Sequence, residues 1–131
     1  MAGCIISLCI VLTNTQFSSA FAKIYQARYL TGMVAGAAQK EGTKRSSNCV
    51  GYLAAYPIPE VVRGLNAFTL GCLRTNPDCV VKAIYIQTWH DDHIETNAAH
   101  FMYDQGCDIV AQVSKKKAGA DVILDTCFTS I

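Results

Sequence analysis

The chain has 131 residues, of which 51% are hydrophobic and 16% are charged, and 11 basic against 10 acidic residues give a formal net charge of +1. This length suits one small domain or a piece of a larger protein, and so apolar a composition excludes a disordered tail. The near-neutral charge argues against a nucleic-acid partner. The one basic run, Lys115–Lys117, contains no aromatic residues and is typical of a solvated turn.

Residues 1–22 allow two interpretations. Cys4 to Leu12 is apolar, and Ser18 to Ala22 contains small residues at A-x-A spacing, which favours a secretory signal cleaved after Ala22. The lack of a basic segment before the apolar run favours instead a divergent N-terminal segment, either a strand or a buried stretch that leads into a helix. The run is too short to span a bilayer as a helix, which needs about 20 apolar residues.

The next segment is predicted to be one long helix. Apolar residues recur at helical spacing from Phe17 to Gln39. Gly32 and Gly36 form a GxxxG pair within this range. Because the segment also carries charged side chains such as Arg28, the pair indicates close packing against a sheet or another helix, and not helix pairing inside a membrane. A polar loop follows from Glu41 to Asn48.

From residue 50 to residue 113 the sequence alternates between strand and helix patterns. Short runs rich in β-branched and aromatic residues alternate with stretches in which apolar residues recur every three or four positions. The predicted elements are a strand at Val50–Ala54, a helix at Ile58–Leu73, a strand at Val80–Gln87, a helix at His93–Gln105 and a strand at Asp108–Val113. Such βαβ units predict an α/β fold, a parallel sheet of at least three strands with flanking helices in three layers.

Some of these elements carry sharper expectations. One stripe of the first helix in this region should face the sheet, and it consists of Val61, Leu65, Phe68 and Cys72. Arg63 and Asn66 should face away from the sheet. The strand at Val80–Ile86 is expected to be buried on both faces. Gly106 is placed to end the second helix in a left-handed conformation.

The carboxyl ends of the strands predict a ligand site. Ligands of open parallel sheets bind beyond these ends, which fall here at Ala55–Pro57, Thr88–Asp91 and Gln112–Ser114. The second end contains Trp89, the one tryptophan of the chain. On pattern alone, Trp89 could also pack against the helix that follows it. The residues expected to converge on the ligand are Trp89, Tyr56, Ala55, Asp91 and Gln112.

Seven cysteines are many for a chain of this length. They are Cys4, Cys9, Cys49, Cys72, Cys79, Cys107 and Cys127. No CxxC pair occurs, so the spacing of a zinc site is absent. Several cysteines lie in predicted strands or helices, where a free thiol behaves as a small hydrophobic group, and this favours buried thiols. A disulfide between Cys72 and Cys79, which only a turn separates, is the main alternative.

Metal binding and catalysis are both disfavoured. The run His90–His93 contains residue types that ligate zinc or iron. Adjacent residues that lead into a helix point in different directions, however, so we interpret Asp91 and Asp92 as residues that cap the helix start and expect no metal or cofactor. No serine elbow or glycine-rich phosphate loop occurs. A thiol pair of Cys107 with His100 would lie at the wrong edge of the sheet, so the sequence predicts a protein that is not an enzyme.

Three stretches carry a resemblance to a known family: KIYQARYLTGMVAGAAQK, YPIPEVVRGLNAFTLGCLRTNPD and TWHDDHIETNAAHFMYDQGCDIVAQ. In this order and spacing they resemble the basic membrane protein family, also called the purine nucleoside receptor family. Its members are substrate-binding lipoproteins of ABC transporters with a type I periplasmic-binding fold. The resemblance implies transport rather than catalysis, an extracytoplasmic position at the plasma membrane, and a membrane permease as partner. It also implies a purine nucleoside bound between two lobes, with Trp89 stacked on the base.

The resemblance covers about Lys23 to Gln112, so we assign residues 23–113 to a partial substrate-binding domain. Met1–Gln16 and Lys115–Ile131 do not resemble the family, so residues 1–22 are set apart as a possible signal or divergent segment and residues 114–131 as a divergent tail. Asp121–Ile131 could form one more strand or a weak helix. Family members are far longer and supply ligand contacts from a further half-lobe. The chain therefore resembles a truncated member, which is expected to bind a nucleoside weakly or not at all. The alternative is a structural remnant without a ligand, which associates with a completing chain.

Overall fold

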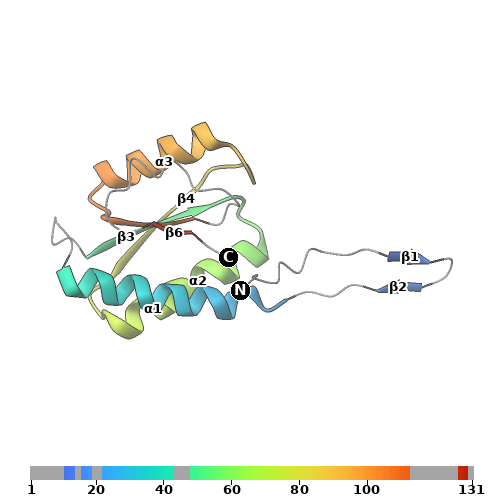
Figure 1. Ribbon diagram of the computed structural model, residues 1–131, viewed down its shortest axis with the longest axis horizontal. Helices are drawn as coiled ribbons and strands as arrows, with labels where there is room; N and C mark the ends of the chain where they lie inside the picture. The colour runs from blue at the N-terminus through green and yellow to red at the C-terminus, as the bar shows by residue number, and fades with distance from the viewer. Residues whose placement is uncertain (1–10, 14–15, 19–21, 43–47, 113–126, 130–131) are drawn as a thin grey trace.

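The computed structural model describes residues 11–13, 16–18, 22–42, 48–112 and 127–129. Its elements in chain order are β1 (Val11–Thr13), β2 (Gln16–Ser18), α1 (Ile24–Gly42), β3 (Cys49–Ala54), α2 (Pro59–Thr75), β4 (Val80–Tyr85), α3 (Asp92–Asp104), β5 (Ile109–Gln112) and β6 (Cys127–Thr129). Helices and strands alternate from α1 to β5, which confirms the predicted α/β fold (Figure 1). β1 and β2 pair as an antiparallel hairpin that stands apart from this unit.

Four parallel strands form the sheet, in the order β4-β3-β5-β6. β3 pairs with β4 along its whole length, from Cys49 opposite Val80 to Ala54 opposite Tyr85, and with β5 on its other side. This confirms the predicted parallel sheet. β6 shows that part of the C-terminal tail forms a strand, where the sequence allowed a strand or a weak helix. The connection from β5 to β6, which includes Lys115–Lys117, lies outside the described residues.

Helices cover both faces of the sheet, with α1 and α2 on one face and α3 on the other (Figure 1). Successive side chains of a strand point to opposite faces. Tyr52 of β3 accordingly joins the apolar core beneath α1 and α2, whereas Leu53 joins the core beneath α3. All β3 residues are buried. β3 is therefore the strand around which both layers pack, as expected for a parallel strand covered on both faces.

The predicted apolar stripe of α2 faces the sheet. Phe68 is fully buried, and its ring lies 5.1 Å from the ring of Tyr52, measured between centroids. Leu65 packs against the same core. Arg63 and Asn66 are exposed. The predicted orientation of this helix is therefore confirmed.

α1 and α2 pack against each other so closely that glycines are needed at the contact. A Cβ atom on Gly32 would collide with the backbone carbonyl of Phe68, and one on Gly71 would collide with the carbonyl of Tyr29. The Thr75 hydroxyl also donates a 2.9 Å hydrogen bond across the contact to the Met33 carbonyl. The GxxxG pattern of α1 thus serves helix packing, which agrees with the expectation from the sequence.

The start of α1 differs from the prediction. The helix begins at Ile24, and not at Phe17, because Gln16–Ser18 forms strand β2. Apolar spacing alone suggested a longer helix, but Thr13 and Phe17 favour strands over helices. The predicted signal segment lies mostly outside the described residues.

The prediction that Val80–Ile86 is buried on both faces is wrong. In the described sheet β4 pairs with β3 alone, so it is an edge strand, and Val80 is 55% exposed. β-branched composition indicates a parallel strand but carries no information on its position in the sheet. Lys82 suits the edge, because its Nζ donates a 2.9 Å hydrogen bond to the carbonyl of Gln105 and its charge discourages pairing with other chains.

Cys49 and Cys107 form a disulfide at the amino edge of the sheet, with their Cα atoms 4.7 Å apart. The expectation of buried free thiols is wrong for these two cysteines, because spacing in the sequence does not indicate a pair that is 58 positions apart. They meet only because β3, which begins at Cys49, pairs with β5, which follows Cys107.

Cys72 and Cys79 are free and buried. The predicted buried thiols are therefore confirmed for these two cysteines, and the alternative disulfide between them is wrong. A hydrogen bond between the two thiols, together with burial, raises the pKa of Cys72, while the same bond lowers the pKa of Cys79. Cys4 and Cys9 lie outside the described residues.

Candidate functional site

The loops that follow β3 and β4 run side by side past the carboxyl edge of the sheet. The backbone N–H of Ile86 donates to the carbonyl of Ala54, and the N–H of Gln87 donates to the carbonyl of Ala55, both at 2.9 Å. The parallel pairing of the strands thus continues one step into the loops. It brings the residues that follow each strand to the same place.

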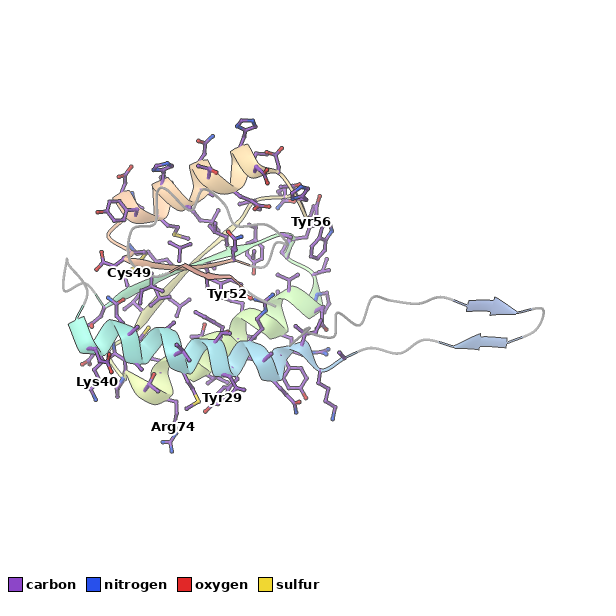
Figure 2. The ribbon with its side chains drawn as sticks, in the orientation of Figure 1. Tyr29, Lys40, Cys49, Tyr52, Tyr56 and Arg74 are labelled. Carbon is purple, nitrogen blue, oxygen red and sulfur yellow. A yellow bond between two sulfur atoms is a disulfide. The ribbon has the colours of Figure 1, made fainter. Side chains whose placement is uncertain are left out.

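Tyr56 and Trp89 lie next to each other at this edge. Their ring centroids are 5.5 Å apart and the ring planes are tilted by 51°. Trp89 is 51% exposed, whereas Tyr56 is half-buried. Figure 2 shows Tyr56 at the end of the sheet that lies near the start of α3. We call these two residues the aromatic pair; together they offer a partly exposed apolar surface on which a flat or apolar ligand group can stack.

The loop that carries Trp89 is sharply turned. Gln87 adopts a left-handed backbone conformation with φ of 58°, which is uncommon for a residue other than glycine. The Thr88 hydroxyl then accepts a 3.2 Å hydrogen bond from the backbone N–H of His90. These two features redirect the chain directly after β4 and fix the position of Trp89. Left-handed residues of this kind occur preferentially at functional sites.

Asp91 caps the start of α3. Its Oδ1 accepts hydrogen bonds from the backbone N–H groups of His93 and Ile94, both at 3.0 Å. The N–H of Asp91 in turn donates a 3.3 Å bond to Oε1 of Glu95, a fully buried carboxyl group. The predicted capping role of Asp91 is confirmed. The same bonds hold the backbone two residues after Trp89, so the cap also positions the aromatic pair.

Ala55 and Gln112 lie in the buried part of this edge. Gln112 ends β5, which lies on the other side of β3 from β4. The structure thus brings Tyr56 and Trp89 into contact, while the other three predicted residues support the edge or cap a helix. A role of all five in ligand binding remains a prediction.

Sequence reasoning missed Arg28, a buried cation near the same edge. It lies on α1, is only 8% exposed, and its Nη1 donates a long 3.4 Å hydrogen bond to the carbonyl of Gln112. Burial lowers the pKa of the guanidinium, and the nearby Tyr52 partly offsets this effect. A signal was available, because Arg28 shares one helical stripe with Ala35 and Gln39, which are also buried.

Within the described ranges, no group of three or more histidine, cysteine, aspartate or glutamate side chains is arranged to hold a metal ion. His90 Nδ1 lies 3.9 Å from Asp92 Oδ1, and both side chains are about half exposed. In the same part of the chain, none of the helices is long and apolar enough to cross a membrane.

Comparison with known proteins places this chain in a family. A family model described as ABC transporter substrate-binding protein PnrA-like matches residues 9–125, which extends beyond both ends of the range that carries the sequence motifs. The chain is 37% identical over 113 residues to a purine-binding protein of Brucella abortus, covering 86% of this chain and 31% of that protein. It is 38% identical over 103 residues to a putative ABC transporter glucose-binding protein of Haloferax volcanii, covering 79% of this chain and 25% of that one.

A solved ABC transporter solute-binding protein from Conexibacter woesei has the same fold. Its TM-score is 0.60 at 24% identity, and the match covers 70% of this chain and 28% of that one. The chain therefore spans less than a third of the length of these relatives. The family consists of solute-binding proteins and not of enzymes. Because the family model covers nearly all of the described α/β unit, the chain belongs to the PnrA-like family of ABC transporter substrate-binding proteins.

Proposed function

We propose that the chain supplies part of the ligand site of an extracytoplasmic substrate-binding protein that delivers a purine nucleoside to a membrane permease. The observation that carries this proposal is the contact between Tyr56 and Trp89, at 5.5 Å between ring centroids, on the edge of the sheet where ligands of parallel α/β folds bind. The purine-binding relative of Brucella abortus supports the choice of ligand.

Stacking is the interaction that this surface can provide. A base stacked on an aromatic side chain gains roughly 1–3 kcal/mol. Trp89 is 51% exposed, so part of the indole is accessible to a ligand. The Asp91 cap holds the neighbouring backbone, which reduces the entropy lost when the ring is ordered. Ala55, Tyr56, Asp91 and Gln112 would then line or support the same subsite.

A sugar is the second candidate ligand. The relative from Haloferax volcanii is named as a putative glucose-binding protein, at an identity similar to that of the purine-binding relative. Sugar rings also pack against aromatic faces, so the aromatic pair alone does not separate the two ligands. Glucose therefore belongs in the same binding test as the nucleosides.

We further propose that this chain by itself binds its ligand weakly. It spans 31% of the purine-binding relative, and the aromatic pair covers one side of a ligand only. Weak affinity follows because a one-sided surface recovers part of the stacking energy and leaves the ligand largely in water. The alternative is that the chain has no ligand and acts as a structural remnant that associates with a completing chain.

The proposal is tested by calorimetric titration of inosine, guanosine, adenosine and glucose into the chain, alongside the fluorescence of Trp89. We expect millimolar rather than micromolar affinity for the nucleosides, and loss of the heat signal in Trp89→Ala. Phe101→Ala is the matched control, because Phe101 is an aromatic residue of similar exposure on α3. It should leave binding unchanged.

The other outcomes are equally decisive. Tight binding that persists in Trp89→Ala would disprove the site, and tight binding that this variant abolishes would disprove the claim of weak affinity. A response to glucose alone would favour the sugar ligand. No response to any ligand, with the protein folded by circular dichroism, would favour the structural remnant.

A further inference from the structure

A buried positive charge lies under the carboxyl end of β5 and has no acidic partner in the described part of the chain. Arg28 is 8% exposed. Between described residues, Arg63 forms an ion pair with Glu60, and His90 lies 3.9 Å from Asp92, a contact that is an ion pair only when the imidazole is protonated. Neither contact involves Arg28. A buried cation is costly unless it is paired and hydrogen-bonded, so an unpaired one needs an explanation.

The path of the side chain shows where the guanidinium is held. An added Cβ on Gly64 would lie 3.6 Å from Cγ of Arg28 and 3.5 Å from the hydroxyl of Tyr52. The stem of Arg28 therefore passes between α2 and the central strand β3, and Figure 2 shows Tyr52 in this space between the sheet and the two helices. The guanidinium then reaches the last residue of β5, at the carboxyl edge.

The guanidinium makes one hydrogen bond to the described residues, and that bond is long. A guanidinium carries five N–H donors in a rigid, planar fork. One of them reaches the Gln112 carbonyl at 3.4 Å, beyond the usual range for an N–H···O bond. Such a fork matches the two oxygens of a phosphate or carboxylate, with which it forms short, charge-assisted bonds.

We propose that Arg28 is an anion-binding residue that takes a phosphate oxyanion at the carboxyl end of β5. The aromatic pair lies at the ends of β3 and β4, on the same edge of the sheet. β5 pairs with β3, so the two places belong to the same edge of the sheet. The phosphate is either free or carried by a nucleotide whose base stacks on the aromatic pair, and only the second source rests on the proposed function.

The first experiment measures the thermal stabilisation of the full chain by inorganic phosphate, with chloride at equal ionic strength as the reference. The wild-type protein should be stabilised by phosphate, whereas Arg28→Met, which keeps the apolar stem and removes the charge, should lose affinity by at least about tenfold. Arg74→Met is the matched control, since Arg74 is an exposed arginine that points away from the sheet (Figure 2). It should respond like the wild type.

A second measurement needs no variant, in case Arg28→Met does not fold. The side-chain Nε–H resonance of Arg28 in the wild-type protein should shift on addition of phosphate, while that of Arg74 should not. The inference is overturned if the Arg28 resonance stays in place, or if phosphate stabilises Arg28→Met as much as the wild type.

The source of the phosphate is decided by calorimetric titration of AMP and adenosine. A nucleotide ligand should bind at least about tenfold more tightly than the nucleoside, because the phosphate adds charge-assisted bonds. Equal affinities together with a phosphate response identify free phosphate. Adenosine binding without any phosphate or AMP effect at Arg28 overturns this inference and leaves the proposed function standing. A phosphate response without adenosine or AMP binding supports this inference and contradicts the proposed function.

Discussion

The two edges of the sheet are built from different interactions. At the amino edge the Cys49–Cys107 disulfide joins β3 to the turn before β5, and the buried thiols belong to Cys72 in α2 and to Cys79 directly before β4. At the carboxyl edge, the loops are held by backbone hydrogen bonds and the Asp91 cap, and Trp89 remains half exposed. Figure 2 shows Cys49 and Tyr56 at these opposite ends.

This difference separates the scaffold from the site. The core and the amino edge gain stability from apolar burial and a covalent link, which leaves few groups for a ligand. At the carboxyl edge Trp89 is half exposed and Tyr56 is half-buried, so part of the aromatic surface there faces water. Function usually lies on loops positioned by a rigid scaffold, and this chain follows that arrangement. Substitutions in the core should therefore mainly lower the free energy of unfolding, whereas substitutions at the carboxyl edge should mainly lower ligand binding.

The largest effect is expected in the core. Phe68→Ala removes a fully buried ring that packs against Tyr52, and it should lower the free energy of unfolding by about 3–5 kcal/mol. Urea denaturation followed by circular dichroism measures this. Leu70→Ala on the same helix is the control, because Leu70 is 62% exposed and its truncation should stay within about 0.5 kcal/mol. Equal losses in both variants would show that α2 does not bury the predicted stripe.

The contact between α1 and α2 should give the next largest effect. Gly32→Ala places a methyl group against the Phe68 carbonyl and should lower the free energy of unfolding by about 1–3 kcal/mol. Gly64→Ala in α2 is the matched control. Its Cβ would meet the Tyr52 hydroxyl at an ordinary 3.5 Å, so higher helix propensity should raise stability by up to about 1 kcal/mol. Effects of the same sign would contradict the close helix packing.

The helix cap at the carboxyl edge should contribute less than the core. Asp91→Ala removes two hydrogen bonds at the start of α3 and should lower the free energy of unfolding by about 1 kcal/mol. Asp91→Ser can still cap the helix and should retain most of this stability. The fluorescence anisotropy of Trp89 should fall in Asp91→Ala, since the loop loses an anchor. Unchanged anisotropy with reduced stability would mean that the cap does not position the aromatic pair.

The core was predictable because local patterns determine it. Proline, aspartate and glycine marked the ends of α2 and α3, and Gly106 indeed adopts a positive φ of 87°. Strand order was not predictable in the same way, because β-branched residues such as Val80 occur in edge and central strands alike. The Cys49–Cys107 pair was missed for the same reason, since it depends on which strands are neighbours.

The candidate site was predictable only in part. The rule that parallel strands end at one edge brought Tyr56 and Trp89 together correctly. The rule could not predict that Ala55 and Gln112 are buried, since burial depends on the helices that cover the two faces of the sheet. Arg28 was missed because it comes from α1, outside the strands and loops to which that rule applies, and because a charged residue in a helix is normally exposed.

The smallest effect on stability is expected at Trp89, where the effect on binding should be largest. The side chain is half exposed, so Trp89→Ala should change the free energy of unfolding by no more than about 0.5 kcal/mol, measured by circular dichroism. Trp89→Phe keeps an aromatic face beside Tyr56 and should retain part of the nucleoside affinity, whereas Trp89→Ala should not. A loss above about 2 kcal/mol in Trp89→Ala would place this ring in the core, which is the alternative that the sequence left open, and would remove the distinction between scaffold and site at the carboxyl edge.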